Sequence, residues 1–139
     1  MAETFTCDIV TPVSTVFSGE ATYVGLPGEV GSFGVMRRHE PLVSALKSGV
    51  VSVTTPEAGK DGTIRFVLSG GYAQISDDKV IVLANEAVAI NEIDSAKVKA
   101  DLAKVEGVIA GLKDGDSSAA YYKGQKAWYE LQLKAVSGE

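Results

Sequence analysis

The fold of this chain is decided by a glycine-rich stretch between residues 25 and 50, which reads GLPGEVGSFGVMRRHEPLVSALKSGV. Its four glycines recur at every third position, at Gly25, Gly28, Gly31 and Gly34. Glycines at this density allow turns, bulges and close approach of backbones rather than side-chain chemistry. Strand-like apolar segments flank the stretch, so we predict a loop carried on a rigid β-sheet. Because functional residues concentrate on such loops, we interpret this one as a docking surface.

The composition is that of a soluble globular protein with one domain, or one domain and a small appendage. The 139 residues are 45% apolar, and the net charge of −5 argues against non-specific binding to nucleic acid or anionic lipid. No apolar run approaches the ~20 residues that span a bilayer, and the start, MAETFTCDIV, lacks the pattern of a secretory signal. We therefore expect no membrane-spanning segment.

The single cysteine, Cys7, excludes an internal disulfide and is compatible with a reducing cytosol. Cys7 alternates with Phe5 and Ile9, which is the period of a half-buried strand. We expect a buried packing role for this thiol rather than a nucleophile's role.

The residues from Phe5 to Glu86 have the texture of a β domain, with turn signals every 8–12 residues. The run at 79–83 is apolar after its first residue, Lys79, which is typical of a buried strand. The turn signals at 47–49 and 70–71 separate or punctuate neighbouring strands. Strands are predicted at residues 5–9, 16–19, 20–26, 42–46, 50–54, 63–68, 72–75 and 79–83. This pattern favours a two-layered β-sandwich of about ten short strands, over residues 1–87.

The pattern becomes helical at Asn91. A first helix is indicated by apolar residues at alternating spacings of four and three, with Asp94 or Asn91 as its cap and Gly115 near its end. These residues are Val98, Leu102, Val105, Ile109 and Leu112.

A second helix follows a short reversal at residues 114–118, with Ser117 as its predicted cap. One side of this helix is predicted to carry Tyr121, Trp128, Leu131 and Ala135. The short connection implies an antiparallel two-helix hairpin over residues 91–136, so the whole chain is assigned to the α+β class.

Three glycines weaken the predicted helices. Gly107, Gly111 and Gly124 each cost about 1 kcal/mol relative to alanine inside a helix. Two interpretations stay open: the glycines allow close helix–helix approach, or they allow the hairpin to leave one position and rearrange.

Motifs of catalysis are absent from the sequence. It contains no phosphate-binding glycine loop, no nucleophile elbow and no zinc-protease motif, and it holds one histidine and one cysteine. Two alternatives remain: an enzyme that uses His39 with Arg37 and Arg38 on a phosphorylated substrate, and a stand-alone small-molecule-binding β-sandwich with a dimerising helical tail. The chain is best interpreted as a binding module without cofactor or metal.

The order of short motifs carries a specific likeness to a known family. The motifs are Ile9-Val10-Thr11-Pro12, Val16-Phe17-Ser18-Gly19-Glu20, Leu26-Pro27-Gly28-x-x-Gly31-x-Phe33-Gly34-Val35, His39-x-Pro41-Leu42-Val43, Leu46-Lys47-x-Gly49, Leu68-Ser69-Gly70-Gly71-Tyr72, Val82-Leu83-Ala84-x-Glu86-Ala87 and Ile93-Asp94. In this order the chain resembles, over nearly its whole length, the epsilon subunit of the bacterial F-type ATP synthase, which is called delta in mitochondria.

The resemblance implies a β-sandwich followed by a helical hairpin, in a subunit of the central rotor stalk that has no catalytic site of its own. It implies binding to the gamma subunit and to the ring of c subunits, and transient contact of the helices with the catalytic alpha and beta subunits. The sandwich would couple ring rotation to the catalytic head, and the hairpin would restrain ATP hydrolysis. The expected location is peripheral, on the cytoplasmic face of the bacterial inner membrane, with no nucleic-acid partner.

Carried over to this chain, the family's rotor contacts fall on the glycine loop and the residues after it. The expected interface residues are Gly28, Glu29, Gly31, Ser32, Phe33, Arg37, Arg38 and His39. The chain departs from the family pattern at Ser32, where an acidic residue is common, and at Arg37-Arg38, which replace a Pro-Gly pair.

ATP binding on the hairpin, which occurs in some members of this family, falls on Ile93, Asp94 and Lys97 here. No arginine follows Arg65, and lysine lacks the bidentate fork of arginine. We therefore predict weak or absent binding of ATP as a regulatory ligand. The lysines of the second helix, Lys123, Lys126 and Lys134, suggest a modest brake on hydrolysis.

Overall fold

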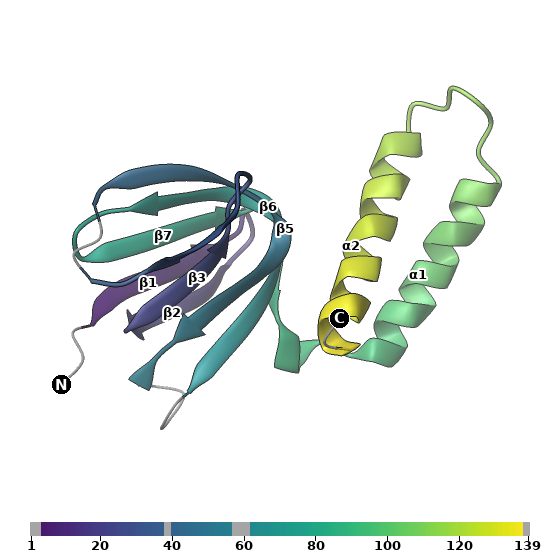
Figure 1. The fold of residues 1–139 in the computed structure, drawn as a ribbon. Coiled ribbons are helices and arrows are strands. Elements are labelled where there is room, and N and C mark those ends of the chain that lie inside the picture. Colours follow the sequence, from purple (N-terminus) through teal and green to yellow (C-terminus); the bar gives the residue numbers. More distant parts are fainter. Residues whose placement is uncertain (1–3, 38–39, 57–61, 138–139) are drawn as a thin grey trace. The chain divides into compact units, whose positions relative to one another are not determined.

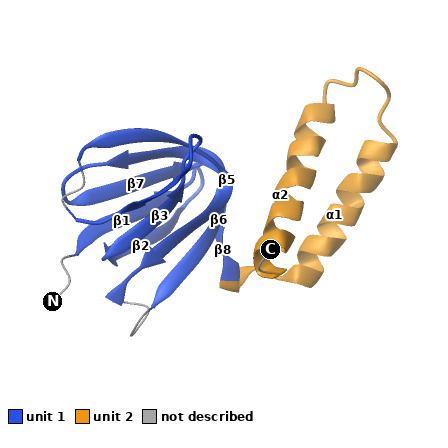
Figure 2. Ribbon diagram, in the orientation of Figure 1, with its two compact units in different colours: residues 1–90 blue, residues 91–139 orange. Residues whose placement is uncertain are grey.

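The computed structural model describes residues 4–37, 40–56 and 62–137. The chain divides into two compact units, residues 1–90 and residues 91–139, which are coloured separately in Figure 2. The first unit is built of strands and the second of helices (Figure 1). This arrangement confirms the predicted α+β class.

The described residues of the first unit form eight strands. They are β1 (Phe5–Val10), β2 (Thr15–Ala21), β3 (Tyr23–Pro27), β4 (Ser32–Val35), β5 (Leu42–Thr54), β6 (Thr63–Ile75), β7 (Lys79–Ala84) and β8 (Ala87–Ala89). Several details differ from the prediction: the strands predicted at 42–46 and 50–54 form the single strand β5, those at 63–68 and 72–75 form β6, and β8 was not predicted. The segment predicted as one strand at 20–26 is divided at Thr22, and β4 occupies part of the stretch predicted as a loop.

The strands follow the order β2-β1-β7-β6-β5-β3-β4, and β8 also pairs with β6. The pairing is antiparallel except between β1 and β7. The long strands β5 and β6 pair with each other along their length. On their other edges, β7 pairs with the C-terminal half of β6, β8 with its N-terminal half, and β3 with the C-terminal half of β5. One layer therefore consists of β2, β1, β7 and the halves 71–75 and 42–46, and the other of β8, β3, β4 and the halves 63–68 and 48–54. Counting the two long strands in both layers gives ten segments, in agreement with the predicted sandwich of about ten strands.

The two long strands change layers at residues 46–49 and 69–71. Gly70 and Gly71 have φ values of 91° and 147°, in the region that L side chains rarely adopt. The residues of β6 that belong to the core are even-numbered before this point, at Phe66 and Leu68, and odd-numbered after it, at Ala73 and Ile75; Val67 is also buried but is not part of this core. The predicted turn at 47–49 is thus wrong, since β5 continues through it, but it marks a real irregularity.

Apolar side chains from both layers fill the interior of the sandwich. Cys7 and Ile9 from one layer and Val53 and Leu68 from the other are fully buried members of a single core. The rings of Phe17 and Phe66 also connect the layers, with centroids 5.6 Å apart. Since ~25 cal/mol is gained per Å² of apolar surface buried, this core is the main stabilising term of the unit.

The second unit contains a short 3₁₀ turn, η2 (Ile90–Glu92), and two helices, α1 (Ser95–Ala110) and α2 (Ala119–Ser137). The helices lie side by side and antiparallel in Figure 1, as predicted. Asp94 is the N-cap of α1, because its carboxylate accepts a hydrogen bond of 3.2 Å from the backbone N–H of Lys97. The helix ends at Ala110, so Leu112 of the predicted stripe lies beyond it.

The apolar side predicted for α2 is wrong in one position. The side chain of Tyr121 is 64% exposed, whereas Trp128 and Leu131 are half-buried and the neighbouring Gln132 is buried. The helix also begins at Ala119, which is later than a cap at Ser117 implies. In the preceding turn, hydrogen bonds from the hydroxyl and the backbone N–H of Ser118 lower the pKa of the Asp116 carboxyl.

Candidate docking surface

The loop between β3 and β4, together with Ser32 at the start of β4, is held against β5, and we call these residues (28–32) the glycine tip. Gly28 forms an isolated antiparallel bridge with Leu46, and the Glu29 N–H donates a 3.0 Å hydrogen bond to the carbonyl oxygen of Ala45. The Gly31 N–H donates to the Gly28 carbonyl oxygen at 3.1 Å. A Cβ at position 28 would lie 2.7 Å from the Gly31 carbonyl oxygen, so the tight turn requires glycine there.

The side chains at the glycine tip are largely exposed. Glu29, Gly31 and Ser32 are exposed, and Val30 at the apex is fully exposed. Phe33 is half-buried and packs against the core, so its ring fixes the tip to the sandwich. Of the predicted interface residues in this loop, Glu29, Gly31 and Ser32 are therefore accessible to a partner.

The structure separates this tip from the arginine segment that follows β4. Arg37 is exposed, and its guanidinium donates a 2.7 Å hydrogen bond to the carbonyl oxygen of Thr4, at the start of β1. Ser32 begins β4 and Arg37 follows its last residue, Val35, so a strand of about 10 Å, at ~3.3 Å per extended residue, lies between them. Arg38 and His39 lie outside the described residues.

An apolar band that was not predicted lies beside the glycine tip. It consists of Val43, Tyr72 and Leu83, which are 68%, 60% and 50% exposed. Tyr72 pairs directly with Leu83 on β7 and with Ala45 on β5, and paired residues point to the same side of a sheet. Because Ala45 also accepts the hydrogen bond from Glu29, the band is continuous with the glycine tip.

The sequence feature that relates to this band is the apolar run that ends at Leu83. The run at 79–83 was predicted to be a buried strand, but only Val80 and Val82 are fully buried, while Ile81 is half-buried and Lys79 and Leu83 are exposed. The strand therefore buries one face only. Three large apolar side chains on adjacent strands of one exposed face are unusual for a monomer and are typical of an interaction site.

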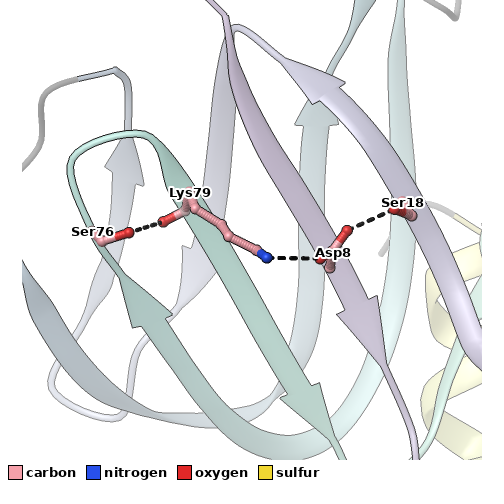
Figure 3. Close-up of polar contacts among 4 residues, drawn as sticks. All are labelled: Asp8, Ser18, Ser76 and Lys79. Carbon is pink, nitrogen blue, oxygen red and sulfur yellow. Dashed lines mark hydrogen bonds and ion pairs between the residues drawn. The ribbon is translucent and has the colours of Figure 1, made fainter.

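Polar groups border the band on the same face of the sheet. The Ser18 hydroxyl donates a 2.7 Å hydrogen bond to the Asp8 carboxylate, and the Lys79 ammonium lies 3.7 Å from the other oxygen of that carboxylate (Figure 3). Asp8 pairs in register with Ile81, two residues before Leu83. Ser76 holds the turn before β7 through a 3.2 Å hydrogen bond from its hydroxyl to the Lys79 carbonyl oxygen. An apolar centre with a charged rim is the usual anatomy of a protein interface.

A shallow groove of about 380 Å³ lies over β3, β4 and β5. The ring of Tyr23 lies over Gly34, where a Cβ would overlap it, and near Gly25. The groove presents hydroxyl and apolar groups and no charged side chain: its lining is Tyr23, Gly25, Leu26, Ser32, Phe33, Gly34, Val50 and Ser52. It therefore offers hydroxyl donors but no positively charged side chain to a phosphate or a carboxylate.

Cys7 has the buried packing role that the sequence predicts. It is fully buried in the core, and burial, with a smaller effect of the neighbouring Asp8 charge, raises the pKa of its thiol to about 12. At neutral pH the sulfur is a thiol and not the nucleophilic thiolate.

The three residues predicted for ATP lie around the start of α1. Asp94 and Lys97 are exposed and Ile93 is half-buried. The Asp94 carboxylate caps the helix, as described above, so its geometry is explained by local structure. In residues 4–37, 40–56 and 62–137 no three His, Cys, Asp or Glu side chains are grouped as metal ligands, and no helix there is long and apolar enough to cross a bilayer.

The sequence has relatives of known family. Residues 4–90 match the family described as ATP synthase, Delta/Epsilon chain, beta-sandwich domain. The ATP synthase epsilon chain of Stenotrophomonas maltophilia (strain K279a) is 38% identical over 130 residues, which cover 93% of this chain and 91% of that protein. The ATP synthase epsilon chain of Neisseria meningitidis serogroup C is 33% identical over 129 residues, 93% of this chain and 90% of that one.

Solved structures share the fold. A chain of the Euglena gracilis mitochondrial ATP synthase OSCP/F1/c-ring structure aligns with a TM-score of 0.67 and 22% identity, over 98% of this chain and 82% of that chain. A chain of the Tetrahymena thermophila mitochondrial ATP synthase central stalk and c-ring aligns with a TM-score of 0.54 and 14% identity, over 94% of this chain and 95% of that chain. The β-sandwich spans the residues that match the family, and the two relatives are similar to this chain over nearly their whole length. This chain therefore belongs to the ATP synthase delta/epsilon chain family.

Proposed function

We propose that this chain is a central-stalk subunit of an F-type ATP synthase, which couples rotation of the c-ring to the catalytic head. Family membership supports this role, as do the solved assemblies that contain similar chains together with F1 or the c-ring. In this role the chain contributes binding surfaces and no catalytic site, and it lies peripherally on the cytoplasmic face of the bacterial inner membrane.

The observation that carries the proposal is the apolar band beside the glycine tip. A rigid sheet face with Val43, Tyr72 and Leu83 exposed suits permanent attachment to a protein partner, and we assign it to the gamma subunit. The glycine tip, with exposed Glu29, Gly31 and Ser32, is assigned to the polar loops of the c-ring. Arg37, together with Arg38 and His39, would then contact the stalk at the other end of β4.

The two parts of the chain have different roles in this proposal. Residues 1–87 dock onto the rotor, and residues 91–136 modulate ATP hydrolysis by transient contact with the alpha and beta subunits. Exposed Lys123 and Lys134 on α2 offer positive charge for acidic surfaces. ATP binds weakly or not at all at Ile93, Asp94 and Lys97, which calorimetric titration of the full chain with ATP would check.

The docking assignment is tested by placing a charge in the apolar band. We expect Val43→Glu to abolish co-purification with the gamma subunit, because a desolvated carboxylate at an apolar interface has no partner. Val13→Glu is the control: Val13 is even more exposed than Val43, at 91% against 68%, and lies in the loop between β1 and β2. Normal assembly of a folded Val43→Glu variant would refute the assignment.

A further inference from the structure

The strand β4 is an edge of the sheet that lacks the usual protection against pairing with another chain. It ends the order β2-β1-β7-β6-β5-β3-β4 and, among the described residues, it pairs with β3 alone. Its four residues, Ser32–Val35, include no charged residue and no proline, and they pair with β3 in unbroken register. An open edge presents unpaired N–H and C=O groups, which bind a further strand unless charges, prolines or bulges interfere. The edge of β4 is therefore suited to pairing with an extended segment.

The other edges formed by the described residues are better protected. At the opposite end of the strand order, β2 carries Glu20, and its pairing with β1 shifts in register between Ile9 and Val10. The strand β8 has only three residues. The first half of β5 is covered by the glycine tip, through the hydrogen bond from Glu29 to Ala45. Because short strands, charges and irregular pairing limit edge-to-edge association, β4 is the edge at which a further strand is most readily added.

The sequence around β4 is complementary to itself when it is read in opposite directions from Phe33. Three of the four pairs of residues at equal distances from Phe33 match in size, in polarity or in opposite charge: Ser32 corresponds to Gly34, Val30 to Met36 and Glu29 to Arg37. Glu29 and Arg37 are exposed, and the apolar side chains of Val30 and Met36 are fully and 64% exposed. These four side chains are thus available to a partner, and each has its complement in the same segment.

We propose that two copies of this chain associate by antiparallel pairing of their β4 strands about a two-fold axis at Phe33. In this arrangement Ser32 of each copy lies opposite Gly34 of the other, and the two sheets continue into one another. At each end of the paired strands, the glycine tip of one copy meets the segment that follows β4 in the other. Glu29 then faces Arg37, and the two exposed apolar side chains meet beside this ion pair.

Main-chain hydrogen bonds and charges have different roles in this interface. Hydrogen bonds between the two β4 edges provide the binding free energy, and the ion pairs fix the register. The Arg37 guanidinium is held by its 2.7 Å hydrogen bond to the Thr4 carbonyl oxygen, and with five N–H donors it can also bind a carboxylate. Since β4 has only four residues, the interface is smaller than the roughly 1,200 Å² of stable complexes, and we expect a weak, concentration-dependent dimer.

This association goes beyond the proposed function and competes with it. Glu29 and Ser32 are assigned to the c-ring, and Arg37 to the stalk, so a paired chain has these residues covered. The competition rests on the proposed function, whereas the pairing itself is a property of the free chain. A measurement on the free chain therefore tests the pairing whether or not the rotor assignment holds.

Sedimentation velocity of the full chain at low salt, at concentrations from about 10 µM to about 1 mM, tests the pairing. We expect the average mass to rise from 14.5 kDa toward twice that value. Glu29→Arg and Arg37→Glu should each weaken association at least about tenfold, because like charges then face each other at both ends of the paired strands. An equimolar mixture of these two variants should associate as the native chain does, since every opposite-charge pair forms again between them.

Val43→Glu is the control for a different interface, because Val43 belongs to the apolar band and not to β4. It should leave the dimer unchanged, and circular dichroism verifies that each variant is folded. Because Arg37→Glu also removes the hydrogen bond to Thr4, Glu29→Arg alone decides the result if Arg37→Glu does not fold. A native chain that stays monomeric throughout, single variants that associate as well as the native chain, or a mixture of folded variants that stays monomeric would each overturn the proposal. Loss of the dimer in Val43→Glu would assign the association to the apolar band and overturn it as well.

Discussion

Gly71 lies so close to the carbonyl group of Leu83 that a Cβ at position 71 would overlap the Leu83 oxygen. The φ of Gly71 is 147°, and the residue pairs with both Leu46 and Ala84 at the point where β6 passes from one layer to the other. The backbone contact therefore fixes the change of layer. It also positions the next residue, Tyr72, on the exposed face as part of the apolar band.

We predict that Gly71→Ala destabilises the chain by about 3 kcal/mol or more, since the substitution adds both an unfavourable φ and a backbone overlap. Urea unfolding of the full chain measures the loss. Gly25→Ala is the control, because its Cβ would make only an ordinary contact of 3.5 Å with the Tyr23 ring. A Gly71→Ala variant as stable as the control would show that the strand can bend without glycine.

The ring of Tyr23 covers Gly34, so we predict that removing the ring compensates for a larger residue at position 34. Gly34→Ala should cost about 1–3 kcal/mol, because the new methyl group displaces the ring. In a Tyr23→Ser background the same substitution should cost much less, since the space above Gly34 is then open. A double-mutant cycle measured by thermal unfolding gives the coupling free energy. Additive effects of the two substitutions would contradict this arrangement.

Much of the fold could be predicted because local patterns and tertiary structure agree. The alternation around Cys7 and the helical spacing of Val98, Leu102 and Val105 predict the faces that are buried in the structure. The turn at 47–49 could not be predicted correctly, because a glycine-containing break in period-2 alternation has two physical outcomes. It either reverses the chain or bends one long strand, and only pairing with β6 over residues 42–54 decides between them.

The candidate site was less predictable than the fold. The glycine tip was predicted from its density of glycines, but the apolar band joins Val43, Tyr72 and Leu83 from three strands that are distant in sequence. An apolar residue at an outward position is indistinguishable from a core residue until the sheet register is known. Arg37 is likewise separated from the tip by the extended strand β4, which was predicted as part of a loop because of its surrounding glycines.

The buried thiol of Cys7 predicts a pH dependence of stability at alkaline pH. An exposed cysteine in the unfolded chain has a pKa near 9.0, whereas the folded pKa is raised to about 12. Between these values unfolding releases a proton, so stability is fully present below pH 9 and falls as pH rises toward 12. The gap corresponds to at most about 4 kcal/mol.

The comparison protein for this measurement is Cys7→Ala, which lacks the buried thiol and is otherwise the same chain. We expect it to be less stable at pH 7, by about 1 kcal/mol for the lost packing, and to lose less stability between pH 9 and 11. Denaturant unfolding at a series of pH values gives both slopes. Equal slopes for the two proteins would mean that Cys7 is not protected from ionisation in the folded state.

The N-cap at Asp94 predicts which substitutions at the start of α1 are tolerated. Its carboxylate accepts the Lys97 N–H, one of the backbone donors that a helix start leaves unpaired, so Asp94→Ala should destabilise the helical unit by about 1 kcal/mol. Asp94→Asn keeps an acceptor oxygen and should cost only a few tenths of a kcal/mol. Thermal melts followed by circular dichroism at 222 nm, a wavelength at which helices dominate, compare the two variants.

Because the capping hydrogen bond is internal to the chain, the difference between alanine and asparagine should be the same with and without ATP. A difference that appears only in the presence of ATP would instead identify Asp94 as a nucleotide ligand and contradict the assignment of its carboxylate to the cap.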